Sequence, residues 1–230
     1  MKKRRIIGTV GRVWESDRGL TVFLVVLVLT VFVLPAVIPR GSTAAIAFDL
    51  LYSLVIITGV VGISSNRAVR QALVAAVVIS LGIRWLGWRS PSRLLDVLSA
   101  GSWVFSTGVL AGVVLKKVFG PGPVSTHRIL GAVSAYILLA MTWAGAYAMI
   151  ASGIPESFRG LADAQRVDGD LLYYSLVTLT TVGYGDITPV HGIARSLAGM
   201  EALVGQLYPA ILIARLVTLA GGGSSETRSS

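Results

Sequence analysis

The sequence contains no cysteine and few charged residues. With no cysteine among 230 residues, disulfide bonds and thiol chemistry are excluded. Charged residues make up 13% of the chain, whereas soluble domains carry roughly 25%. Together with 54% hydrophobic residues and a mean hydropathy of +0.77, this composition predicts a membrane-embedded protein. The two histidines, His127 and His191, are isolated, and no combination of nucleophile, base or metal ligands indicates an enzyme.

Long apolar runs support this prediction. A bilayer core about 30 Å thick requires about 20 apolar residues per helix. Six stretches meet the requirement, and the third is the weakest because Arg84 falls inside it. They are residues 20–38, 44–63, 71–88, 94–115, 129–151 and 192–219. We therefore expect an all-α membrane protein with six transmembrane helices and no sizeable soluble domain.

The positive charge of the chain, +9 in total, is distributed unevenly around these spans. Thirteen of the 20 Lys and Arg residues would lie on the side of the membrane that holds both termini, and seven on the other side. The positive-inside rule then predicts cytoplasmic N- and C-termini. This distribution favours membrane topology and contact with anionic lipid over binding to nucleic acid. The basic N-terminus is expected to precede a retained anchor, because no convincing signal-peptide cleavage site follows it.

The spans divide the chain into two membrane modules with short ends. Residues 1–19 form a basic cytoplasmic N-terminus, and residues 20–120 form a bundle of four helices joined by short loops. Residues 121–220 form the second module, and the tail at 221–230 is expected to be disordered. The connector KKVFGPGPVSTHR, Lys116 to Arg128, separates the modules, because its two prolines and two glycines end any helix.

The second module contains a long interruption between its two spans. Residues 152–169, which we call the turret, are polar and expected to be extracellular. Residues 170–180, DLLYYSLVTLT, would form a helix only about 16 Å long, which is too short to cross a bilayer. Non-helical backbone at membrane depth is tolerated only inside protein or beside a water-filled cavity. The segment that follows this short helix is therefore predicted to line a pore.

That segment contains Thr181–Gly185, TVGYG. Its glycines alternate with larger residues, and glycine adopts left-handed backbone angles at little cost. Alternating left-handed and ordinary angles can turn successive carbonyl groups toward one side. Several such strands around an axis would form stacked rings of oxygen atoms, which can replace the hydration shell of a cation.

The sequence LYYSLVTLTTVGYGDITP resembles the pore helix, filter and exit loop of tetrameric potassium channels. Because of this resemblance, we call Thr181–Gly185 the filter segment. RILGAVSAYILLAMTWAGAYAMI and MEALVGQLYPAILIARLV resemble the outer and inner pore helices of six-span prokaryotic-type members of that family. The resemblance covers roughly residues 121–220, and over the first four spans it is only architectural. It implies a homotetrameric pore with a re-entrant pore helix and filter loop, and K⁺ ions in the filter without any other cofactor.

The resemblance also assigns roles to individual residues. Thr181 is implied to bind K⁺ through its hydroxyl and carbonyl groups. Val182, Gly183 and Tyr184 are implied to bind it through their carbonyl groups, and Gly185 completes the implied selectivity filter. The residues implied to support the filter are Tyr174, Thr180, Asp186 and Glu201. Tyr173 and Tyr174 stand where many relatives have two tryptophans, and Val177 stands where some have a buried glutamate.

The last span carries a further group of candidate residues. Gly205 lies 19 residues after Asp186, where relatives have a glycine at which the inner helix bends, and Pro209 also favours a kink. Close helix packing is an alternative reason for Gly205. Glu201 is an acid inside a membrane span, so it is expected to have a function, preferably behind the filter rather than in the pore. By position, Gln206 and Ile213 are expected to face the cavity.

A voltage sensor is not predicted. Residues 94–115 contain no Lys or Arg, whereas Arg84, Arg89 and Arg93 cluster before them. Moving one charge across the field contributes about 2.3 kcal/mol per 100 mV, so steep gating requires several charges that cross. We expect Asp49 and Asp96 to pair with Arg84 and Arg93 instead, and this structural pairing is favoured over a sensing role of the cluster.

These observations lead to the hypothesis of a potassium-selective channel in the cell membrane that conducts passively and is not strongly voltage-gated. Two alternatives remain open at this point. A potassium transporter subunit usually carries several degenerate pore loops per chain, whereas this chain has one complete loop. A non-conducting modulatory subunit would not need an intact filter. The sequence does not indicate what opens the pore.

Overall fold

The computed structural model describes residues 18–33, 50, 52–56, 59, 67–89, 92–120, 126–161 and 167–222, and these are mostly helical, as predicted. Residues 1–17 of the predicted N-terminal segment, most of the second span and residues 223–230 of the tail lie outside the described residues. The elements are α2 (Arg18–Val28), the π-helix η1 (Leu29–Val33), α5 (Arg67–Arg89), α6 (Arg93–Val118), α7 (Thr126–Gly153), β1 (Phe158–Arg159), α8 (Val167–Leu179), β2 (Thr188–Pro189) and α9 (Gly192–Gly222).

Three of the described helices are long and apolar enough to cross a membrane. They are Arg93–Val118, Arg128–Gly153 and Gly192–Arg215, which coincide with the fourth, fifth and sixth predicted spans. The shorter apolar helices Leu20–Val33 and Val74–Ile83 lie in the first and third predicted spans. A helical membrane architecture is thus supported, whereas the number of six spans stays a prediction.

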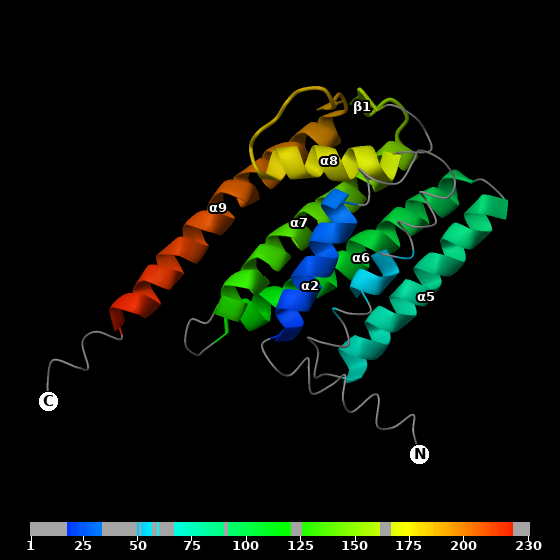
Figure 1. The fold of residues 1–230 in the computed structure, drawn as a ribbon. Helices are drawn as coiled ribbons and strands as arrows, with labels where there is room; N and C mark the ends of the chain where they lie inside the picture. The colour runs from blue at the N-terminus through cyan, green and yellow to red at the C-terminus, as the bar shows by residue number, and fades with distance from the viewer. Residues whose placement is uncertain are drawn as a thin grey trace, which may run out of the picture.

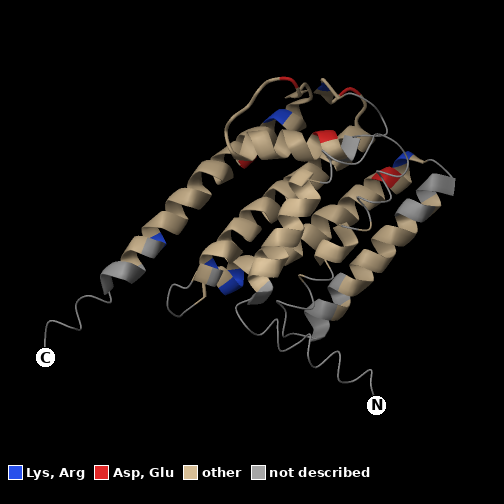
Figure 2. Cartoon of the chain, in the orientation of Figure 1, with Lys and Arg blue, Asp and Glu red and all other residues tan. Residues whose placement is uncertain are grey.

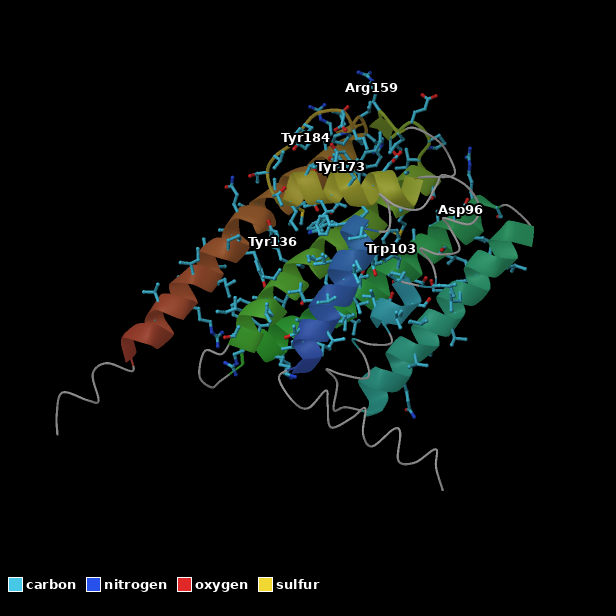
Figure 3. The ribbon with its side chains drawn as sticks, in the orientation of Figure 1. Asp96, Trp103, Tyr136, Arg159, Tyr173 and Tyr184 are labelled. Atoms are coloured by element: carbon cyan, nitrogen blue, oxygen red, sulfur yellow. The ribbon has the colours of Figure 1, made fainter. Side chains whose placement is uncertain are left out.

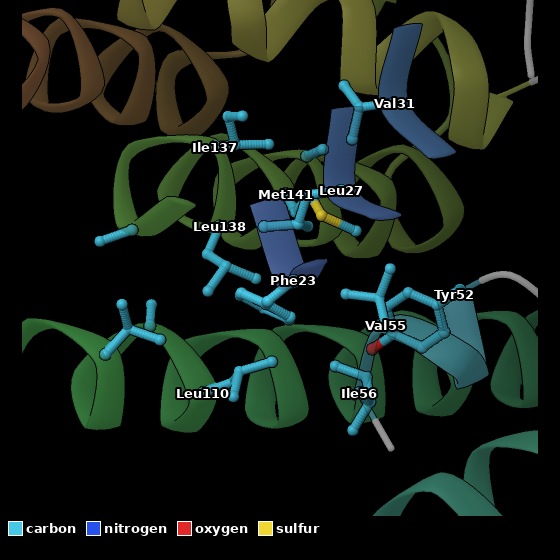
Figure 4. Close-up of a cluster of buried hydrophobic side chains, with 14 of the residues drawn as sticks. Phe23, Leu27, Val31, Tyr52, Val55, Ile56, Leu110, Ile137, Leu138 and Met141 are labelled. Carbon is cyan, nitrogen blue, oxygen red and sulfur yellow. The ribbon is translucent and has the colours of Figure 1, made fainter. Parts of the chain in front are cut away.

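The helices pack around α7. In Figure 1, α6 lies beside α7, α5 lies along the outer side of α6, and α2 packs against α7. Phe23 and Leu27 of α2 meet Leu110 of α6 and Met141 of α7 in a buried apolar cluster (Figure 4). In a membrane such contacts stabilise the bundle through van der Waals packing, since lipid is as apolar as the side chains.

Small residues allow α6 and α7 to approach each other closely. A β-carbon at Gly145 of α7 would lie 3.0 Å from the side chain of Val104 and 3.3 Å from that of Trp103, both of which belong to α6. Small residues at helix crossings have this role in membrane proteins, because association depends on close contact.

The charges of the described helices lie mainly near their ends. α6 begins after Ser92, whose carbonyl accepts a hydrogen bond from the Asp96 amide at 3.1 Å, and it carries Lys116 and Lys117 in its last turn. An acid in the first turn and bases in the last turn suit the helix dipole. Figure 2 shows the helix middles almost free of blue and red, as expected for segments at membrane depth.

The arrangement of α6 bears on the voltage-sensor question. Its basic residues are Arg93 at the beginning and Lys116 and Lys117 at the end. Arg93 and Asp96 are exposed, whereas Asp49 and the side chains of Arg84 and Arg89 lie outside the described residues. The pairing of the clustered arginines with acids therefore stays a prediction.

Candidate functional site

The short helix predicted before the filter segment is α8, which spans 13 residues from Val167 to Leu179. At 1.5 Å per residue its length is about 20 Å, still less than a bilayer crossing. In Figure 1, α8 lies across the upper end of α7, and the loop that carries the filter segment arches from α8 to α9. The loop begins after Leu179, whose carbonyl group accepts a hydrogen bond from Tyr136 of α7 and lies against Gly205 of α9.

The backbone of the filter segment alternates in sign. The φ angles of Thr181, Gly183 and Gly185 are 59°, 54° and 80°, and among the described residues the only non-glycine positions with positive φ are Glu156 and Thr181. Val182 and Tyr184 therefore lie between left-handed positions without being left-handed themselves. The alternation was expected at the two glycines but not at Thr181. A β-branched residue with positive φ is rare, and such strain is concentrated at functional sites.

Hydrogen bonds attach the filter segment to the last turn of α8. The Thr181 amide donates to the Thr178 carbonyl at 2.9 Å. The Val177 carbonyl accepts from the amides of Val182 and Gly183 at 2.9 and 3.1 Å. These bonds engage carbonyl groups at the helix terminus that would otherwise lack a partner, and they fix where the segment leaves α8.

The side chains of the filter segment are exposed in the single chain. Val182 is 53% exposed and Tyr184 is 72% exposed. The Tyr184 ring stacks on the Tyr173 ring with 6.5 Å between centroids and 3° between planes (Figure 3). Within one chain, Tyr173 of α8 thus stacks on a residue of the filter segment.

The other predicted support residues have different surroundings. Tyr174 is buried, and its ring packs edge-on against Tyr147 and Phe158 at 5.0 and 5.5 Å. The Thr180 hydroxyl donates to the Leu176 carbonyl at 2.7 Å and so helps to end α8. Their roles toward the filter stay predictions.

The turret contacts the exit of the filter segment, which sequence reasoning missed. β1 pairs with β2 in antiparallel register, and the Ser157 carbonyl accepts from the Val190 amide at 2.8 Å. Gly160 has φ +89°, and a β-carbon there would lie 2.0 Å from the Asp186 carbonyl oxygen. The polar composition of the turret indicates only a loop, and Gly160 was the one available signal of a close backbone approach.

Helix α9, the predicted inner helix, continues without a break through Gly205 and Pro209. A β-carbon at Gly205 would lie 1.8 Å from the Leu179 carbonyl oxygen, so close packing against the end of α8 is a direct reason for this glycine. A hinge at Gly205 and Pro209 stays a prediction. Gln206 and Ile213, expected at a cavity, are both exposed in the single chain.

Tyr136 of α7 is a residue at this site that sequence reasoning did not single out. Its hydroxyl donates to the Leu179 carbonyl at 2.9 Å and lies 3.4 Å from the Gly205 carbonyl oxygen (Figure 3). Pro209 has no N–H to donate to the Gly205 carbonyl four residues earlier. Tyr136 thus approaches two carbonyl groups at the places where α8 ends and where the hydrogen bonding of α9 is interrupted.

Glu201 faces the helices behind the filter segment. It is wholly buried by its own chain, and its carboxyl group accepts a hydrogen bond from the Tyr147 hydroxyl at 2.7 Å. The Ser175 hydroxyl of α8 makes a short contact with its other oxygen. Glu201 of α9 thus contacts α7 and α8, whereas its expected role behind the filter stays a prediction.

Residues 135–220 match the family model described as "Ion channel". This match extends from within α7 through α8 and the filter segment into α9. It supports the presence of an ion channel domain in this part of the chain, and therefore that the protein is a channel. The remaining elements, from α2 to α6, precede the matched residues.

Individual relatives agree with this match over shorter stretches. A stretch of 48 residues, 21% of the chain, is 52% identical to Protein LctB of Bacillus caldotenax. A stretch of the same length is 54% identical to Protein LctB of Geobacillus stearothermophilus. The two pore potassium channel c of Oryza sativa subsp. japonica is 32% identical over 84 residues, 36% of this chain. The chain spans about a third of each LctB protein, 35%, and 17% of the rice channel.

Proposed function

We propose that the chain is one subunit of a potassium-selective channel that conducts K⁺ passively across the cell membrane. The observation that carries the proposal is the alternation of the filter segment, in which Thr181, Gly183 and Gly185 have left-handed φ angles. The potassium channel among the relatives supports the choice of ion. Weak dependence on voltage belongs to the same proposal.

The proposed ligands are backbone oxygen atoms. Alternating φ lets successive carbonyl groups face one side, so that the carbonyl groups of Thr181, Val182, Gly183 and Tyr184 form a column, with the Thr181 hydroxyl at its inner end. Rings of such oxygens replace the hydration shell of K⁺. Tyr174, Thr180, Asp186 and Glu201 would support this column from outside.

One chain supplies one column, so several chains must share an axis to form rings. Closed cyclic symmetry is the usual solution, and we propose four copies. The exposure of Val182 and Tyr184 supports this, since neighbouring chains would cover apolar side chains that one chain leaves open. Lys116, Lys117 and Arg128, near the ends of α6 and α7, would face anionic lipid at the cytoplasmic surface. A mass measurement in nanodiscs that finds only monomers or dimers would count against the tetramer.

Ion flux from liposomes that contain only the purified protein tests this function. We expect K⁺ efflux down its gradient, much slower Na⁺ efflux, and inhibition by Ba²⁺. A transporter subunit or a non-conducting subunit would give no such flux in the absence of other proteins. Flux of Na⁺ as fast as that of K⁺ would contradict the selectivity.

A pair of variants links the flux to the site. Thr181→Val removes the hydroxyl group while it keeps a β-branched side chain at the same φ, so it should weaken Ba²⁺ inhibition. Thr181→Ser keeps the hydroxyl and is the matched control. Equal Ba²⁺ inhibition in wild type and both variants would exclude the Thr181 hydroxyl as a ligand.

A further inference from the structure

The carboxyl group of Glu201 has no basic residue beside it in the described part of the chain. The groups that act on it there are the hydroxyls of Ser175 from α8 and Tyr147 from α7. The other titratable groups that face it are Tyr136 of α7 and Tyr174 of α8, which are also phenols. Glu201, Ser175 and Tyr147 are each 0% exposed, so their own chain alone shields them from solvent.

Three close oxygen–oxygen contacts connect this cluster. The Tyr147 hydroxyl lies 2.7 Å from one Glu201 oxygen, and the Ser175 hydroxyl makes a short contact with the other. The same Ser175 hydroxyl lies 2.7 Å from the Ala140 carbonyl oxygen of α7. Each contact requires one hydrogen atom between its two oxygen atoms, because a carboxylate or a carbonyl group can only accept.

The number of available hydrogen atoms distinguishes the two states of Glu201. If Glu201 is ionised, Tyr147 and Ser175 supply two hydrogens for three contacts, and Ser175 faces one acceptor with nothing to donate. If Glu201 is protonated, its O–H donates to Ser175, Ser175 donates to the Ala140 carbonyl, and Tyr147 donates to Glu201. The protonated state therefore satisfies all three contacts.

The cost of burial favours the same state. A carboxylate at membrane depth without a cation beside it loses its hydration and gains too little in return. A neutral acid whose groups are all hydrogen-bonded avoids this cost. From these two arguments we propose that Glu201 is held as a neutral, protonated acid at neutral pH and links the inner helix, through Ser175, to the backbone of α7.

The contact between Glu201 and Ser175 lies close to the end of α8, where the filter segment begins. Ser175 lies one turn before Leu179 in α8, and Glu201 lies one turn before Gly205 in α9, so the Glu201–Ser175 and Gly205–Leu179 contacts are adjacent. Glu201 is thus a positioning residue for α8, the helix from which the filter segment leaves. This positioning role rests on the proposed function, whereas the protonation state does not.

Infrared difference spectroscopy of the full chain in lipid nanodiscs at neutral pH tests the protonation state. The wild type minus Glu201→Gln spectrum should contain the C=O stretching band of a protonated carboxylic acid. Ser175→Ala removes the acceptor of the Glu201 O–H and should shift this band. Carboxylate bands that disappear in Glu201→Gln, without a band from a protonated acid, would overturn the proposal.

Conduction by the same variants tests the positioning role. Glutamine has the shape of the neutral acid, since its N–H can donate to Ser175 and its carbonyl can accept from Tyr147. Glu201→Gln should therefore assemble and conduct K⁺ like the wild type, whereas Glu201→Ala should lose most of the flux. Failure of Glu201→Gln to assemble, or loss of its flux, would show that the charge is required and would overturn the proposal. A protonated-acid band in a wild type that conducts no K⁺ would contradict the proposed function alone.

Discussion

Gly205 of α9 lies directly against the carbonyl group of Leu179, the last residue of α8. A β-carbon at Gly205 would be 1.8 Å from that oxygen, far inside the sum of the two van der Waals radii. The distance between the inner helix and the start of the filter segment is thus set by the absence of a side chain at this position.

Gly205→Ala should therefore destabilise the assembled protein. The backbone must shift to accept the methyl group, which costs about 1–3 kcal/mol in a well-packed site. Gly199→Ala is the matched control, because it lies in the same helix and its β-carbon would meet nothing within 4 Å of the single chain. We expect thermal unfolding in detergent to shift downward for Gly205→Ala and to stay near the wild-type temperature for Gly199→Ala.

The same pair of variants separates packing from hinge bending at Gly205. Normal stability of Gly205→Ala together with altered opening of the pore would favour the hinge over the packing interpretation.

Tyr136→Phe should weaken the junction between α7, α8 and α9. The Leu179 carbonyl ends α8 and accepts the Tyr136 hydroxyl at 2.9 Å, so loss of that donor leaves a terminal carbonyl unsatisfied, at a cost of about 1–3 kcal/mol. Tyr208→Phe is the comparison, because the Tyr208 hydroxyl donates to Ala132 inside a helix. We expect a larger loss of stability and of K⁺ selectivity for Tyr136→Phe. Equal effects would show that the bond to Leu179 has no special importance.

Gly160→Ala tests the contact between the turret and the filter exit. Gly160 has φ +89°, and its β-carbon would collide with the Asp186 carbonyl oxygen at 2.0 Å, so the exit of the filter segment must move. We expect reduced K⁺ flux and a lower unfolding temperature. Gly169→Ala, whose β-carbon would meet nothing within 4 Å, should behave like the wild type. Unchanged flux in Gly160→Ala would show that the contact between the turret and the filter exit is not required for conduction.

Gly183→Ala tests the alternating backbone itself. A β-carbon there would meet nothing within 4 Å of its own chain, so any intrachain effect must come from the φ angle of 54°. A left-handed angle costs an L-residue about 1–2 kcal/mol, and the cost applies to every subunit. We expect lower K⁺ over Na⁺ selectivity in liposome flux. Conduction with unchanged ion preference would show that the filter assignment is wrong.

Neutralisation of Arg84, Arg89 and Arg93 to Gln tests the absence of a voltage sensor. Charges that stay outside the field contribute little of the roughly 2.3 kcal/mol per 100 mV that a crossing charge supplies. We expect lower expression or stability, caused by lost pairing with acids, and an unchanged shape of the current–voltage curve. A large shift or flattening of a steep activation curve would identify these residues as a sensor.

Local sequence patterns predicted the parts of the site that are continuous in the chain. The short apolar run before TVGYG predicted α8 to within three residues at its beginning and one at its end. The glycines predicted left-handed angles at Gly183 and Gly185, because only glycine adopts them cheaply. Thr181 has such an angle too, and this could not be predicted, since its cost is met by the hydrogen bonds of the surrounding structure.

Contacts between distant segments could not be predicted in the same way. Nothing about a tyrosine in an apolar helix indicates that the Tyr136 hydroxyl will reach a carbonyl 43 residues later in the chain. The pairing of β1 with β2 involves two residues in each strand, too few to form a pattern. For Glu201, an acid within a span indicated a function, but the partners Ser175 and Tyr147 come from the packing of three helices.

Potassium selectivity is tested most directly by the reversal potential of the purified protein in a planar bilayer, with KCl on one side and NaCl on the other. We expect a reversal potential far from zero, with the sign set by K⁺ leaving the KCl side, and currents that Ba²⁺ blocks. A reversal potential near zero under these conditions, or one that follows the Cl⁻ gradient when salt is raised on one side, would contradict a potassium-selective filter at Thr181–Gly185.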